Sequence, residues 1–79
     1  MKNYLNTLIS EKNINTEMIL EVEGAEWGTN FIPLQVVIDF LLSADKGTQD
    51  KAKTNLIKID FANGDVMHFF KYIAAFLAK

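Results

Sequence analysis

The spacing of apolar residues along the chain predicts three main helices. Residues 2–12 place their apolar side chains on one helical face, and the polar stretch at 13–15 ends that helix. Residues 32–44 are apolar except for three residues that form one narrow polar stripe, Gln35, Asp39 and Ser43. Residues 64–78 repeat apolar residues at helical spacing, namely Val66, Phe70, Ile73 and Leu77. A shorter helix of one or two turns is expected from Thr48 to about Thr54.

Two segments have the alternating pattern that is typical of strands. In residues 17–23, Met18, Leu20 and Val22 alternate with Glu17, Ile19, Glu21 and Glu23, and the run ends at Gly24, which predicts a strand with one acidic face. Residues 55–61 alternate in the same way, and we predict a second strand there. Residues 26–31 fit either a short third strand, paired through a hairpin turn at Gly24 and Ala25, or an irregular loop before the helix. Whether the two main strands run parallel or antiparallel stays open.

These elements predict one small α+β domain over residues 1–79, with a sheet of two or three strands and three main helices packed on one of its faces. A sheet of two strands is marginally stable by itself. The helices at 32–44 and 66–78 are apolar over more than half of their circumference, which is more than one small domain covers easily. We therefore expect a homodimer.

Composition narrows the classes of partner. The chain has no cysteine, so neither a disulfide nor a thiolate metal site can stabilise it. All eight basic residues are lysines, and they are scattered and outnumbered by ten acidic residues, which argues against nucleic-acid binding. No apolar run is long enough to span a bilayer, and the N-terminal residues lack the apolar segment of a secretory signal. We expect a cytoplasmic protein without membrane contact.

The only histidine raises the question of catalysis. Asp65 and His68 stand three residues apart at the start of the last helix, and Tyr72 follows one turn later. A carboxylate that orients an imidazole is part of many catalytic and metal sites. The chain offers no second histidine and no nucleophile motif. We therefore expect Asp65 to cap the helix and His68 to lie at its wet border, and a small enzyme or enzyme subunit using these three residues is the alternative.

The acidic strand is the other candidate site. Glu21 and Glu23 point to the same side of their strand, and Asp60 joins them if residues 55–61 lie alongside, with Lys58 as a counter-ion. We expect a solvated face here and not a cation site. Trp27 lies in the least regular segment, where a tryptophan either covers the core or anchors a partner.

No catalytic, metal or cofactor site is therefore expected. The leading hypothesis is a non-enzymatic protein-binding module, such as a small accessory or inhibitor protein of the phage or mobile-element type, which covers a basic partner surface with its acidic face. Its partner-binding residues are expected to be Glu21, Glu23, Trp27 and Asp60. A structural homodimer within a larger assembly is a further alternative.

Overall fold

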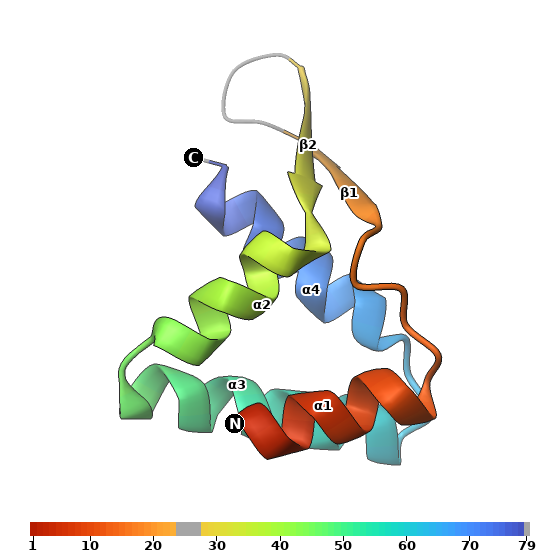
Figure 1. Ribbon diagram of the computed structural model, residues 1–79, viewed down its shortest axis with the longest axis vertical. Coiled ribbons are helices and arrows are strands. Elements are labelled where there is room, and N and C mark those ends of the chain that lie inside the picture. Colours follow the sequence, from red (N-terminus) through yellow and green to blue (C-terminus); the bar gives the residue numbers. More distant parts are fainter. Residues whose placement is uncertain (24–27, 79) are drawn as a thin grey trace.

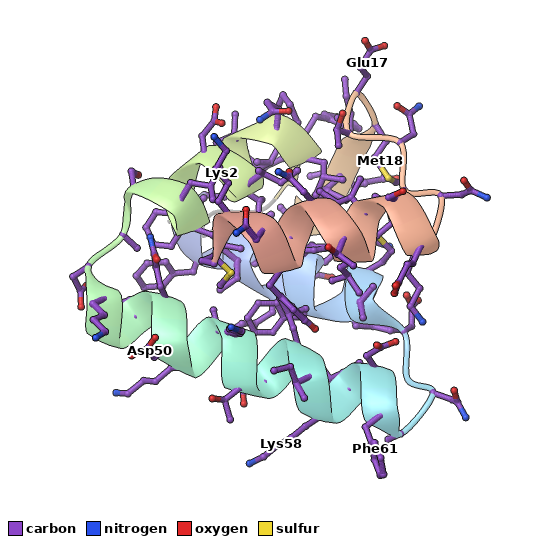
Figure 2. The ribbon with its side chains drawn as sticks, turned by 60° about the horizontal axis from the view of Figure 1, so that its bottom comes forward. Lys2, Glu17, Met18, Asp50, Lys58 and Phe61 are labelled. Carbon is purple, nitrogen blue, oxygen red and sulfur yellow. The ribbon has the colours of Figure 1, made fainter. Side chains whose placement is uncertain are left out.

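A computed structural model describes residues 1–23 and 28–78, which form four helices and one hairpin (Figure 1). The elements in chain order are α1 (Lys2–Glu11), β1 (Ile19–Glu23), β2 (Thr29–Pro33), α2 (Leu34–Ser43), α3 (Lys46–Phe61) and α4 (Val66–Leu77). The hairpin lies at one end of the molecule, and α1 and α3 lie side by side at the other end (Figures 1 and 2). The predicted small α+β fold is confirmed.

The sheet consists of β1 and β2, which pair antiparallel with Leu20 opposite Ile32 and Glu21 opposite Phe31. The third strand that we left open is therefore present as β2, which spans Thr29–Pro33 and not residues 26–31. Strand β2 continues directly into α2. The backbone N–H of Leu34, the first residue of α2, donates to the carbonyl of Met18 at 2.9 Å. This bond fixes the first turn of α2 against the start of β1.

The predicted strand at residues 55–61 is wrong, because these residues form the second half of α3. Ala52, Leu56 and Ile59 are spaced at i, i+4 and i+7, and they are the side chains that α3 turns toward the core. The helix starts earlier than predicted because Asp45, rather than Thr48, is its N-cap. The Asp45 carboxylate accepts from the backbone N–H of Thr48 at 3.1 Å and from its hydroxyl at 2.7 Å. These hydrogen bonds, which favour the ionised form, hold the pKa of Asp45 below its usual value.

Two asparagines end helices in the same way. Asn13 and Asn63 have left-handed backbone angles, with φ of 52° and 57°. After α3, Asn63 N–H donates to Asp60 O and Gly64 N–H donates to Ile59 O at 2.8 Å, which is the Schellman pattern. A Cβ on Gly64 would lie 3.0 Å from the Ile59 side chain and 3.2 Å from its carbonyl oxygen, so any larger residue here would have to displace Ile59 slightly. Asn63 and Gly64 therefore join two helices and do not follow a strand.

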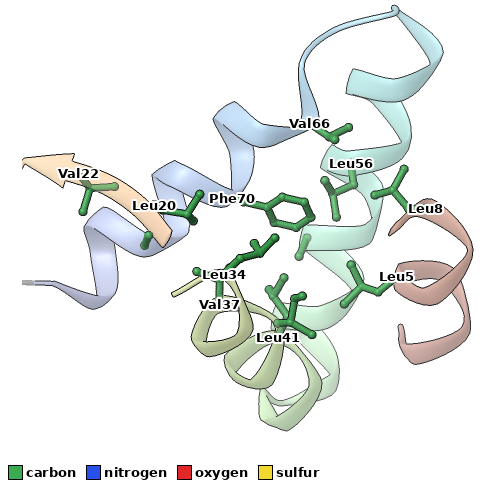
Figure 3. Close-up of a cluster of buried hydrophobic side chains, with 13 residues drawn as sticks. Leu5, Leu8, Leu20, Val22, Leu34, Val37, Leu41, Leu56, Val66 and Phe70 are labelled. Atoms are coloured by element: carbon green, nitrogen blue, oxygen red, sulfur yellow. The ribbon is translucent and has the colours of Figure 1, made fainter. Parts of the chain in front are cut away.

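One apolar core joins the hairpin to all four helices (Figure 3). Leu20 and Val22 of β1 face inward onto α4, and the outward face of the sheet is left to solvent. Phe70 is the bulkiest side chain that is fully buried, and it lies among leucines of several elements (Figure 3). The other fully buried side chains are Leu5, Leu20, Leu34, Val37, Leu41 and Leu56.

The two apolar helices bury one side of their surface in the core. Helix α2 buries Leu34, Val37, Ile38 and Leu41, and helix α4 buries Val66, Phe70 and Ala74. Val36 and Leu42 of α2 and Tyr72 and Phe76 of α4 remain exposed. The homodimer stays a prediction.

Substitutions in α3 test the corrected assignment. Leu56→Ala removes a fully buried side chain and should lower the free energy of unfolding by about 2–5 kcal/mol. Phe61→Ala should change it by no more than about 0.5 kcal/mol, because Phe61 is 91% exposed and points away from the molecule (Figure 2). Urea denaturation of both variants measures this difference. A large loss for Phe61→Ala would mean that this segment packs in another way.

Candidate functional site

The outward surface of the hairpin combines carboxylates with exposed apolar side chains. We call it the acidic hairpin face, and it consists of Ile19, Glu21, Glu23, Thr29, Phe31 and Pro33. Phe31 is 65% exposed and lies directly across the ladder from Glu21, while Ile19 is 59% exposed and lies across from Pro33. The sequence pattern predicted the acidic residues of this face but not its exposed phenylalanine.

Neither carboxylate of this face has an ion-pair partner among the described residues. Glu21 and Glu23 form no ion pair there, and the expected counter-ion Lys58 lies on α3 and points into solvent (Figure 2). Unpaired charges on a rigid strand cost little while they are hydrated, and they remain available to a partner of opposite charge.

Asp60 does not belong to the acidic hairpin face, which corrects the prediction. It lies near the end of α3 and forms an ion pair with Lys12, whose Nζ is 2.6 Å from its Oδ1. This hydrogen bond and the charge of Asp60 raise the pKa of Lys12. Asp60 thus holds the end of α1 against the end of α3. The other predicted contact residue, Trp27, lies outside the described residues.

Asp65 and His68 occupy the positions that a capped helix requires. Asp65 is the N-cap of α4, and its carboxylate accepts from the backbone N–H of Met67 at 2.9 Å. His68 Nε2 lies 3.7 Å from the Asp65 carboxylate, and the histidine side chain is 81% exposed. The prediction of a cap beside a solvent-exposed histidine is confirmed. Tyr72 is also exposed and contributes to a different feature, the pocket between α3 and α4.

This pocket, which we call the α3–α4 pocket, was not predicted from the sequence. It has a volume of about 160 Å³, and its apolar lining comes from α2, α3 and α4, namely Leu41, Ala52, Phe69 and Ile73. Its polar lining includes Lys51, Asn55 and Tyr72. The predicted strand at residues 55–61 excluded this pocket, because only a continuous helix α3 places Lys51 and Asn55 on one stripe facing α4.

Tyr4 forms a second polar corner where α1 meets α3. Its hydroxyl is buried and has no hydrogen-bond partner among the described residues, and the ammonium of Lys53 lies 5.8 Å from the centre of its ring. Burial raises the pKa of the Tyr4 phenol, and the nearby Asp60 carboxylate raises it further. A buried hydroxyl without a hydrogen-bond partner is a cost to stability.

In the part of the chain that the structure describes, no three histidine or carboxylate side chains gather closely enough to hold a metal ion. Across the same residues, no helix combines the length and the apolar character needed to cross a membrane. Comparisons with protein-family models, with curated proteins and with solved structures give no match.

Substitutions at the start of α4 separate a cap from a functional pair. His68→Gln should change the free energy of unfolding by no more than about 0.5 kcal/mol, because the side chain is exposed. Asp65→Ala should lower it by about 1 kcal/mol, because the N–H of Met67 loses its acceptor. Thermal and urea unfolding measure both changes. A loss of several kcal/mol in His68→Gln would contradict this account.

Tyr4→Phe tests the unpaired hydroxyl. At neutral pH, the free energy of unfolding of the variant should equal or exceed that of the parent chain, because the substitution removes a buried hydroxyl that has no partner. Because the pKa of Tyr4 is raised in the folded state, the parent loses folding stability as the pH rises above about 10, its unfolded-state value, through the folded-state value. Unfolding followed from pH 8 to 11 should therefore show a smaller loss in Tyr4→Phe. Tyr72→Phe, at an exposed position, is the control, and a destabilised Tyr4→Phe would show that the hydroxyl has a partner.

Proposed function

We propose that the chain is a non-enzymatic protein-binding module that covers a basic surface of its partner with the acidic hairpin face. The observation that carries the proposal is the exposure of Phe31 beside the unpaired carboxylate of Glu21 on a regular strand pair. Aromatic side chains are enriched at the centres of protein interfaces, and charged groups at their rims. An exposed phenylalanine flanked by carboxylates matches that arrangement.

The energetics support a binding role for the carboxylates better than a structural one. Glu21 and Glu23 lie on the solvent side of the sheet, so they contribute little to folding. Charges of one sign on a small rigid surface speed encounter with an opposite charge, and the effect falls as salt screens it. An accessory or inhibitor protein that obstructs a basic surface works in this way.

The anchor and the charges have separate roles in this proposal. Phe31 supplies apolar area that is removed from water on binding, and Ile19 extends that area along β1. The carboxylates select basic partners over acidic ones, because an unpaired like charge at the interface is costly. Binding strength should then depend chiefly on Phe31, and its salt dependence chiefly on the glutamates.

A charge reversal on the hairpin tests this function. Glu21→Lys combined with Glu23→Lys should change the free energy of unfolding by no more than about 1 kcal/mol. It should also reduce binding to a partner identified by pull-down from the native host and mass spectrometry, most strongly at low ionic strength. Titration of the purified partner measures the loss.

The matched control is Glu11→Lys with Asp50→Lys, which makes the same change in net charge on two exposed helical positions away from the hairpin. Phe31→Ala should weaken binding at every salt concentration, because it removes the apolar anchor. Unchanged binding by both the charge-reversed variant and Phe31→Ala would refute the proposal.

A further inference from the structure

The α3–α4 pocket has the size of a single aromatic ring. A cavity of about 150 Å³ lined by apolar side chains holds one benzene molecule. The pocket has about 160 Å³ and an apolar lining from Leu41, Ala52, Phe69 and Ile73. Sites for whole metabolites or cofactors span about 300–1,000 Å³. The volume therefore favours one side chain of a protein partner.

Polar residues at the edge of the pocket favour a negative charge next to the inserted side chain. Lys51 lines it and has no ion-pair partner among the described residues. Asn55, one turn further along α3, adds an amide that can donate and accept hydrogen bonds. An aromatic side chain with a carboxylate next to it matches this combination.

The acidic hairpin face presents that chemistry. Phe31 projects from the outward face directly opposite Glu21, so the ring and the carboxylate are neighbours across the ladder. The hairpin of the same chain is separated from the pocket by α2, whose ten residues span about 15 Å. The hairpin lies toward one end of the longest axis of the molecule, and α3 lies toward the other end (Figure 1). The hairpin of a second copy of the chain is therefore the occupant that supplies both the aromatic ring and the neighbouring carboxylate.

We propose that Phe31 of one copy inserts into the α3–α4 pocket of a second copy, with Glu21 facing Lys51 across the contact. This inference rests on the proposed function, in that it names the partner of the acidic hairpin face. The contact joins two different surfaces, so it is head-to-tail, and each copy keeps one free hairpin and one free pocket. Such contacts close into rings or continue as chains.

Sedimentation equilibrium of the purified protein between about 1 and 500 μM tests the association. A contact built on a single anchor should give a weight-average mass that rises past that of a dimer at tens to hundreds of micromolar. Phe31→Ala should weaken association by about 30-fold or more, the factor that corresponds to losing an interface anchor. Phe61→Ala, at a more exposed phenylalanine, should leave it unchanged.

The pocket side is tested by variants of α3. Asn55→Trp, which places a bulky ring at an exposed pocket position, and Lys51→Glu should each reduce association. Lys2→Glu, an equal change in net charge on α1, should have no such effect. Glu21→Lys combined with Lys51→Glu should recover much of the association lost by either alone, because the pair is reversed. Circular dichroism melting checks that each variant is folded.

Mixing distinguishes a head-to-tail contact from a symmetric one. Phe31→Ala keeps its pocket and Asn55→Trp keeps its hairpin, so an equimolar mixture should form a 1:1 dimer that grows no further. A monomeric parent protein at all concentrations, or variants that associate like the parent, would overturn this inference. Binding of the host partner through Glu21 and Glu23 would then still stand, because that experiment involves no second copy.

Discussion

The burial of Phe70 where the hairpin meets the helices is the interaction on which the rest of the structure depends. A sheet of two strands cannot protect its own inner face, and β1 turns Leu20 and Val22 inward. Helix α4 covers that face and brings Phe70 to a centre shared with Leu34 and Leu56 (Figure 3). Because this core takes up the inner face of the hairpin, the outer face is left to solvent. The candidate binding surface is thus a direct consequence of how the core is closed.

Helix termini decide where that core can form. Asn13 and Asn63 adopt left-handed angles that let the chain leave α1 and α3 in tight turns, and each turn satisfies carbonyls that a helix end would leave unpaired. At the starts of α3 and α4, the carboxylates of Asp45 and Asp65 accept hydrogen bonds from backbone N–H groups that would otherwise be unpaired. Gln49 adds to this, since its side-chain amide donates to the carbonyls of Leu42 and Ala44 at the end of α2. Polar side chains at the helix ends thus set where each helix begins and ends, and this brings the apolar stripes of the helices together in the core.

Charge is distributed unevenly between the two ends of the molecule. Among the described residues, Glu21 and Glu23 of the hairpin and Lys51 and Lys58 of α3 form no ion pair. Only the Lys12–Asp60 pair joins full charges within the described residues, and it holds α1 to α3. Exposed charges of this kind add little to folding stability, so their arrangement is free to serve recognition. Lys51 lies at the edge of an apolar pocket, and Glu21 lies beside an exposed phenylalanine.

The sequence by itself determined the α+β class, three of the four helices, β1 with its acidic outer side, and the capping role of Asp65. These follow from local periodicity and capping chemistry, which neighbouring residues specify. It failed at residues 55–61, where the alternation of residues 57–61 fits a strand and only a longer window shows the stripe of Ala52, Leu56 and Ile59. Tertiary structure decided the rest. The pairing of Asp60 with Lys12, the exposure of Phe31 and the pocket between α3 and α4 each depend on residues far apart in the chain, whose meeting is set by how the core packs and not by any local pattern.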